Sequence, residues 1–126
     1  MSLKLPFNID LSGKVAVVTG GGGVLCGYMS KLLAEAGAKV AILDLRKEAA
    51  EAVAAEIVKE GGKAMGVACN VLERPSIEAA AVLIEKAFGP ATILVNGAGG
   101  NHKLATTSKE YLFPEDLKQK AEGQVT

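Results

Sequence analysis

The sequence has little of what several classes of protein require. Its 126 residues include no tryptophan, only two cysteines and 4% aromatic residues, and 14 basic side chains balance 14 acidic ones. A chain without net charge lacks the electrostatic footprint of a nucleic-acid-binding protein. No run reaches the roughly 18 apolar residues that a membrane span needs. We therefore expect neither nucleic acid nor a membrane among the partners.

The cysteines and the amino-terminal segment exclude further classes. Cys26 and Cys69 lie far apart, with no second Cys or His at ligand spacing. This argues against a metal site and against a disulfide framework. Residues 1–10 contain one lysine, one proline and no apolar stretch of signal-peptide length. We expect a protein of the reducing cytoplasm.

Four short apolar runs, rich in β-branched residues, predict strands. They lack the strict apolar/polar alternation of a half-exposed strand, so we expect them to be buried on both faces of a parallel sheet. The runs are residues 14–19 (KVAVVT), 39–43 (KVAIL), 64–68 (AMGVA) and 91–95 (ATILV).

Amphipathic segments lie between these runs and predict three helices. Glycines that follow each segment supply the stops, and Pro75 suits the first turn of the third helix. The expected apolar stripes are Leu25, Met29, Leu32, Leu33 and Ala36 in the first helix, Ala50, Val53, Ala54 and Ile57 in the second, and Ile77, Ala80, Ala81, Ile84 and Ala87 in the third.

The alternation of strands and helices predicts an α/β fold, a Rossmann-like doubly wound parallel sheet with four strands and three crossover helices. The first and fourth strands should lie side by side, where a ligand crevice opens at the carboxyl edge. We expect residues 1–126 to form a single dinucleotide-binding domain, with an irregular or partly helical tail at residues 101–126.

A glycine-rich turn follows the first predicted strand and opens the first helix. Without Cβ atoms, its backbone N–H groups could approach a phosphate at the positive end of the helix dipole. The alternative is a purely structural turn, and no Gly-Lys-Ser/Thr follows that would make it a P-loop. The predicted pyrophosphate seat comprises Thr19, Gly20, Gly21, Gly22, Gly23, Val24 and Leu25.

Asp44 and Leu45 follow the second strand, about 20 residues beyond the glycines, where a carboxylate accepts hydrogen bonds from an adenosine ribose. Such a carboxylate repels a 2′-phosphate, which favours NAD over NADP as the cofactor. Two alternatives stay open: Arg46 could receive the phosphate, or Asp44 could cap the helix that begins near Arg46.

Polar and small residues follow the remaining two strands. The Asn70 amide, with Val71 beside it, could bind an adenine edge, although a turn-stabilising role is an alternative. After the fourth strand, small residues leave room for a ribose or nicotinamide to lie against bare backbone. The segment reads Asn96, Gly97, Ala98 and Gly99.

These motifs resemble, in order and spacing, the amino-terminal half of the short-chain dehydrogenase/reductase family over residues 8–100. The matching residues are Thr19-Gly20 with its glycine run, Asp44, Cys69-Asn70-Val71 and Asn96-Gly97-Ala98-Gly99. The family consensus has Thr-Gly-x-x-x-Gly-x-Gly, an acidic residue after strand two, Asp-Val after strand three and Asn-Asn-Ala-Gly after strand four. The strings TGGGGVLCG and NGAGGNH are most similar to the branch of D-mannonate oxidoreductases and fructuronate reductases.

The resemblance implies an NAD-dependent oxidoreductase that transfers hydride between NAD and a secondary alcohol or ketone. The implied substrate is a small molecule, with a sugar acid such as D-mannonate or fructuronate as the narrower expectation. It also implies a homo-oligomer, either a dimer or a tetramer, for the full-length form.

The sequence departs from the family pattern within the glycine turn. The second and third consensus glycines fall on Val24 and Cys26, so close approach to the pyrophosphate should come from Gly22 or Gly23, with Gly27 packing the helix. Two further positions change: Asn70 stands where the family has Asp, and Gly97 stands where it has Asn.

The family's catalytic Ser and Tyr-x-x-x-Lys have no counterpart in the sequence. Leu32 stands four residues after Tyr28, and Glu115 four after Tyr111. We expect His102 in the tail to be a surface residue, with contact between His102 or Lys103 and a substrate as the alternative. We assign no catalytic residue and predict that the chain alone is inactive. It should be the retained part of a longer dehydrogenase, or have its exposed fourth-strand edge covered by a partner. The alternative is a non-catalytic dinucleotide-binding or assembly module.

Overall fold

The computed structural model describes residues 6–100, 111 and 113–114, and all seven predicted elements lie within residues 6–100. The predicted α/β fold is confirmed, with strand bounds that shift by one or two residues. The predicted tail at residues 101–126, including His102, lies almost wholly outside the described residues. The elements are β1 (Val15–Thr19), α1 (Val24–Glu35), β2 (Lys39–Asp44), α2 (Lys47–Lys59), β3 (Lys63–Ala68), α3 (Arg74–Phe88) and β4 (Ile93–Asn96).

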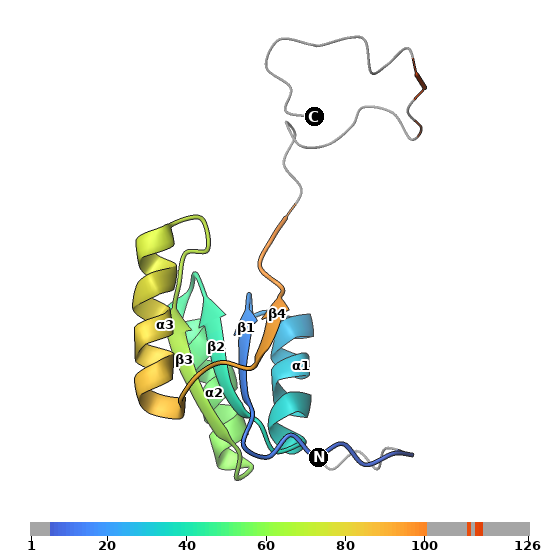
Figure 1. The fold of residues 1–126 in the computed structure, drawn as a ribbon, viewed down its shortest axis with the longest axis vertical. Helices are drawn as coiled ribbons and strands as arrows, with labels where there is room; N and C mark the ends of the chain where they lie inside the picture. Colours follow the sequence, from blue (N-terminus) through green and yellow to red (C-terminus); the bar gives the residue numbers. More distant parts are fainter. Residues whose placement is uncertain (1–5, 101–110, 112, 115–126) are drawn as a thin grey trace.

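The strands form one parallel sheet in the order β3-β2-β1-β4 (Figure 1). This order confirms that the first and fourth strands are neighbours. Thr19, the last residue of β1, pairs with Leu43 of β2 and with Asn96 of β4. All four carboxyl ends therefore lie along one edge of the sheet, where the crevice of a doubly wound fold opens.

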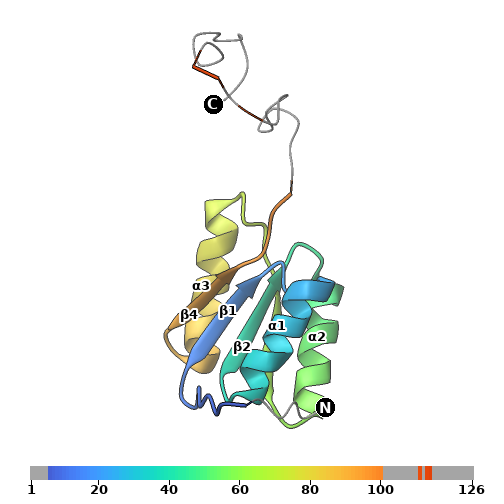
Figure 2. The same cartoon turned by 90° about the vertical axis from the view of Figure 1, so that its right-hand side faces the viewer.

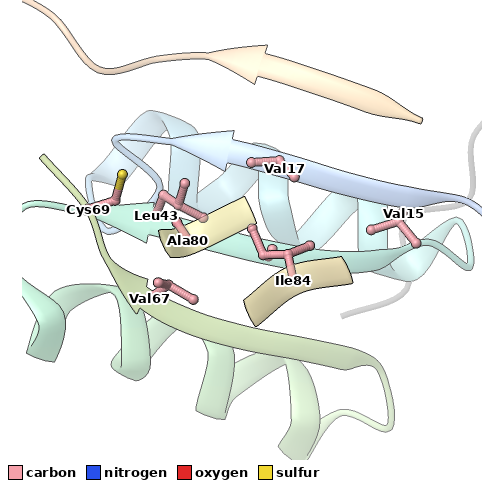
Figure 3. Packing of buried hydrophobic residues seen from close by; sticks show 8 residues of the cluster. Val15, Val17, Leu43, Val67, Cys69, Ala80 and Ile84 are labelled. Carbon is pink, nitrogen blue, oxygen red and sulfur yellow. The ribbon is translucent and has the colours of Figure 1, made fainter. Parts of the chain in front are cut away.

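Helices cover both faces of the sheet, with α1 and α2 on one face and α3 on the other (Figure 2). Alternate residues of β1 and β2 point into two separate cores, as the pleat of a strand requires. The core beneath α1 and α2 contains Ala16, Val18, Val40, Ile42, Ala50, Ala54 and Ile57. Figure 3 shows the other core, where Val15, Val17, Leu43 and Val67 of the sheet meet Ala80 and Ile84 of α3.

Burial on both faces, predicted for all four strands, holds only in the centre of the sheet. Every residue of β1 is buried, whereas β4 alternates between partly buried and exposed residues. Ile93 and Val95 pack against the core beneath α1, while Leu94 on the opposite side is 62% exposed. The reason is that β4 is an edge strand with one strand partner among the described residues, and α3 packs over β2 instead.

The predicted stripe of α1 is wrong in part. Leu25, Met29 and Leu32 are exposed, and the fully buried positions are Gly27 and Ser30. The helix approaches its neighbours through small residues, because a Cβ on Gly27 would lie 3.3 Å both from the Gly21 carbonyl oxygen and from a Val53 methyl group. Gly27 therefore does serve helix packing, as predicted.

The stripe of α2 agrees with the prediction, whereas that of α3 agrees only in part. In α2, Ala50, Ala54 and Ile57 are buried and Val53 is partly buried. In α3, only Ala80 and Ile84 are buried, while Ile77, Ala81 and Ala87 are exposed because this helix meets the sheet along a single line. Pro75 stands in the first turn of α3, and Gly89 follows its last residue with a φ of +96°, as expected for a helix stop.

Candidate functional site

The structure joins the ends of β1, β2 and β4 through hydrogen bonds. The Gly21 N–H donates to the Leu43 carbonyl oxygen at 3.0 Å, which joins the glycine turn to β2. The Thr19 hydroxyl oxygen accepts the N–H groups of Gly97 and Ala98 at 3.1 and 3.2 Å. The glycine turn and the segment after β4 thus form one surface at the carboxyl edge.

Close packing explains the first glycines of the turn. Gly20 has a φ of +66°, and a Cβ there would lie 2.8 Å from the Gly97 carbonyl oxygen. A Cβ on Gly22 would lie 2.9 Å from Asp44 Oδ2, whereas at Gly23 the nearest atom would be 3.4 Å away. Of the two glycines expected to approach a pyrophosphate, Gly22 is closely enclosed by protein atoms, whereas a Cβ at Gly23 would make only an ordinary van der Waals contact.

The amino terminus of α1 has the features of an anion site. Gly23 is its N-cap residue, no side chain caps the helix, and the first turn carries no acidic residue. The first turn of a helix has N–H groups without intrahelical acceptors, at the positive end of the dipole. Here these include the N–H groups of Val24 and Leu25, whose side chains are exposed. A phosphate placed at this end would therefore meet unpaired donors.

Asp44 ends β2 beside this turn, with a side chain that is only 13% exposed. Its Oδ2 accepts the Gly22 N–H at 3.1 Å and its Oδ1 accepts the Arg46 N–H at 3.0 Å. The alternative that Asp44 caps the next helix is not what the structure shows, because Arg46 is the N-cap residue of α2. Arg46 Nε also lies 4.0 Å from Oδ1, so the guanidinium stands beside this carboxylate, while Oδ2 keeps a second lone pair for a further donor.

Asn70 lies just beyond the end of β3, the strand at the opposite edge of the sheet from β4. Its side-chain oxygen accepts the Leu72 N–H at 3.1 Å, so the turn-stabilising role weighed from the sequence is present. The Asn70 N–H donates to Ser76 Oγ at 2.9 Å, and the Cys69 N–H donates to the Asp44 carbonyl oxygen at 2.9 Å. These bonds tie the β3 end to β2 and α3, next to Asp44.

Sequence reasoning missed three contacts of this edge. It grouped Thr19 with the turn without foreseeing that its hydroxyl would hold the segment after β4, and it gave no role to Ser76 or to Ala49. A Cβ on Gly22 would lie 2.7 Å from the Ala49 Cβ. For Thr19, a hydroxyl at the end of an otherwise apolar strand was the feature of the sequence that could have indicated a hydrogen-bonding role.

Among the residues that the structure describes, no cluster of three or more His, Cys, Asp or Glu side chains could hold a metal ion. No helix among the same residues combines the length and the apolar character needed to span a bilayer.

The model of the family described as short chain dehydrogenase matches residues 14–118. The chain belongs to the short-chain dehydrogenase family. An uncharacterized oxidoreductase of Haemophilus influenzae is 46% identical to it over 110 residues, which are 87% of this chain and 39% of the relative. The oxidoreductase UxuB of Bacillus subtilis, also described as uncharacterized, is 49% identical over 106 residues, which are 84% of this chain and 38% of that protein.

Solved structures of this family agree. A candidate D-mannonate oxidoreductase from Haemophilus influenzae, with bound NAD, superposes with a TM-score of 0.74 at 47% identity. The match includes 84% of this chain and 38% of that structure's chain. A hydroxysteroid dehydrogenase from Escherichia coli gives 0.71 at 35% identity, covering 74% and 40%. This chain thus spans about two fifths of the length of these relatives.

Proposed function

We propose that this chain is the NAD(H)-binding part of a short-chain oxidoreductase that transfers hydride between NAD and a secondary alcohol or ketone. The observation that carries the proposal is Asp44, a carboxylate at the end of β2 that two backbone N–H groups hold in place beside the glycine turn. A carboxylate there suits the hydroxyl groups of an adenosine ribose and repels a 2′-phosphate. NAD is therefore preferred over NADP.

The residues at the edge fit a dinucleotide. The uncapped terminus of α1 offers N–H groups to the diphosphate, and a Cβ at Gly99 would have no atom within 4 Å. When bound, the nicotinamide supplies hydride donation or acceptance. The chain's own part is to bind and orient: the turn at residues 19–25 for the diphosphate, Asp44 and Leu45 for the adenosine ribose, Asn70 and Val71 for adenine, and residues 96–99 for the nicotinamide half.

The substrate class follows from the relatives. The NAD-bound neighbour is described as a candidate D-mannonate oxidoreductase, and a D-threitol dehydrogenase of Mycolicibacterium smegmatis is 40% identical over 97 residues, which are 77% of this chain and 37% of that protein. Both names denote polyhydroxylated substrates. We therefore propose a sugar acid such as D-mannonate or fructuronate for the longer protein, acting as a cytoplasmic dimer or tetramer.

Titration of NADH and NADPH against the chain, followed by nucleotide fluorescence, tests the cofactor assignment. NADH should bind more tightly, and Asp44→Ala should weaken NADH binding by about tenfold, since a hydrogen bond to a charged group contributes about 1.5–3 kcal/mol. NADPH binding should weaken less. Glu48→Ala, which removes an exposed carboxylate from the first turn of α2, is the matched control and should leave both affinities unchanged. Tighter binding of NADPH than of NADH by the wild-type chain would reject the assignment.

A non-catalytic dinucleotide-binding or assembly module is the second candidate. It is favoured by the two tyrosines, neither of which has a lysine four residues later. The family's general acid or base is such a tyrosine. Single-turnover oxidation of bound NADH with fructuronate tests the two candidates. Under either one the chain alone should bind NADH without oxidising it, and oxidation by a longer protein carrying Tyr-x-x-x-Lys would reject the non-catalytic module.

A further inference from the structure

Cys26, in the first turn of α1, lies against the backbone of Gly97, which follows β4. Its side chain is partly buried and packs against the core beneath α1 and α2. A Cβ on Gly97 would fall far inside van der Waals contact with the Cys26 sulfur. The thiol therefore occupies the space that any side chain at position 97 would need.

The same backbone is held from the β1 side. The Thr19 hydroxyl accepts the N–H groups of both Gly97 and Ala98, and a Cβ on Gly97 would lie 2.8 Å from the Thr19 carbonyl oxygen. Gly20 approaches so closely that a Cβ there would lie 2.8 Å from the Gly97 carbonyl oxygen. The segment at residues 97–98 is thus enclosed between the end of β1 and the Cys26 thiol.

Cys26 and Gly97 are also two of the positions at which the chain departs from the family consensus. The consensus has glycine at the position of Cys26 and asparagine at the position of Gly97. A larger side chain at one position therefore accompanies the loss of a side chain at the other, and the structure places the two in contact. Residues in contact whose side chains compete for one space are expected to be energetically coupled.

We propose that Cys26 is a positioning residue for the dinucleotide site. By its volume, and without thiol chemistry, it sets the path of the backbone at residues 97–98, against which the nicotinamide half of the cofactor lies. This inference rests on the proposed function, because it requires a dinucleotide at the carboxyl edge. It deepens that function by giving a role to a residue that lies behind the cofactor surface.

A double-mutant cycle tests the pair with two readouts, the unfolding midpoint and the NADH dissociation constant. The variants are Cys26→Gly, Gly97→Asn and the double variant that restores the consensus pair. Gly97→Asn should lower the midpoint by several degrees and weaken NADH binding about tenfold, as expected for a coupling of 0.5–3 kcal/mol between contacting residues. The double variant should recover most of both losses, with a residual loss from the Thr19 carbonyl contact.

Two controls isolate the contact. Gly100→Asn adds the same side chain where a Cβ would have no atom within 4 Å, and it should change neither readout. Cys26→Ser roughly keeps the volume and removes the thiol, so it should bind NADH within about threefold of the wild-type chain.

Additive losses in the double variant would overturn the pairing. The positioning role would be overturned if the effects of Cys26→Gly and Gly97→Asn on the unfolding midpoint were coupled while the wild-type chain, both single variants and the double variant bound NADH equally well. If the wild-type chain bound neither nucleotide, the proposed function would fail, and the positioning role with it. The unfolding cycle would then still decide whether the two positions are coupled, so the two failures are distinguishable.

Discussion

The helices α1 and α2 lie side by side on one face of the sheet but differ in which of their residues are buried. α2 buries a stripe of apolar residues that ends with Ile57, which is 4% exposed. α1 buries Gly27 and Ser30, while Leu25 and Met29 stay exposed. In α2 a large side chain, Ile57, joins two alanines in the buried stripe, whereas the buried positions of α1 are a glycine and a serine. Close approach is not confined to α1, because a Cβ on Gly66 of β3 would lie 2.6 Å from the backbone nitrogen of Glu51 in α2.

Local bonds support the close approach of α1. The Ser30 hydroxyl is fully buried and donates to the Cys26 carbonyl oxygen at 2.8 Å, so its polar group is satisfied within the helix. The Gly27 N–H donates to the Gly23 carbonyl oxygen at 2.8 Å, which starts the helix directly at the glycine turn. The position of the turn relative to β2 therefore depends on small residues in α1.

Ile57→Ala should give the largest loss of stability in this comparison. Removing three carbons from a buried position of α2 leaves a cavity in the core, and we expect a loss of about 3 kcal/mol in the free energy of unfolding. Val58→Ala on the same helix, at a side chain that is 55% exposed, is the control and should change stability by less than about 0.5 kcal/mol. Urea denaturation measures both. Equal losses of stability in Ile57→Ala and Val58→Ala would mean that the buried stripe of α2 does not hold this helix on the sheet.

Gly27→Val should give the next largest loss. Two of the atoms facing Gly27 would lie 3.3 Å from an added Cβ, so the further methyl groups of valine overpack the contact between α1 and α2. We expect a loss of about 2 kcal/mol. Gly27→Ala is the matched control: its gain of about 1 kcal/mol in helix propensity should offset a contact that is a few tenths of an ångström too tight. A valine variant as stable as the alanine variant would show that α1 is free to shift.

The sequence was sufficient for the sheet, because β-branched runs that end in glycine or polar residues report strand position directly. It also placed residues 20–23, Asp44 and Asn96 at one edge, which the strand order confirms; whether they bind a dinucleotide stays a prediction. The stripe of α1 could not be predicted in the same way. Hydrophobic periodicity identifies a buried helix face by its large apolar residues, whereas a close helix contact requires residues of small volume.

Contacts between distant segments were also beyond the sequence. The bond from the Gly97 N–H to the Thr19 hydroxyl joins residues separated by 78 positions. The fit of the Cys26 sulfur beside Gly97 likewise depends on how α1 and β4 are placed on the sheet. Each residue type is compatible with many environments, and only the packed structure selects among them. Exposure at the edge strand has the same origin, since Leu94 and Val17 belong to similar apolar runs.

Met29→Gln should have the smallest effect of the three. Its side chain is 38% exposed on the face of α1 that turns away from the core, so a polar replacement of similar length loses little buried area. We expect a change below about 0.5 kcal/mol. Leu33→Gln on the same helix is the matched comparison, because Leu33 packs against the core beneath α1 and α2; burying an amide there should cost about 1–3 kcal/mol. A loss at Met29 as large as at Leu33 would mean that another apolar surface covers this face of α1 in solution. The difference in exposure between α1 and α2 would then not hold for the protein in solution.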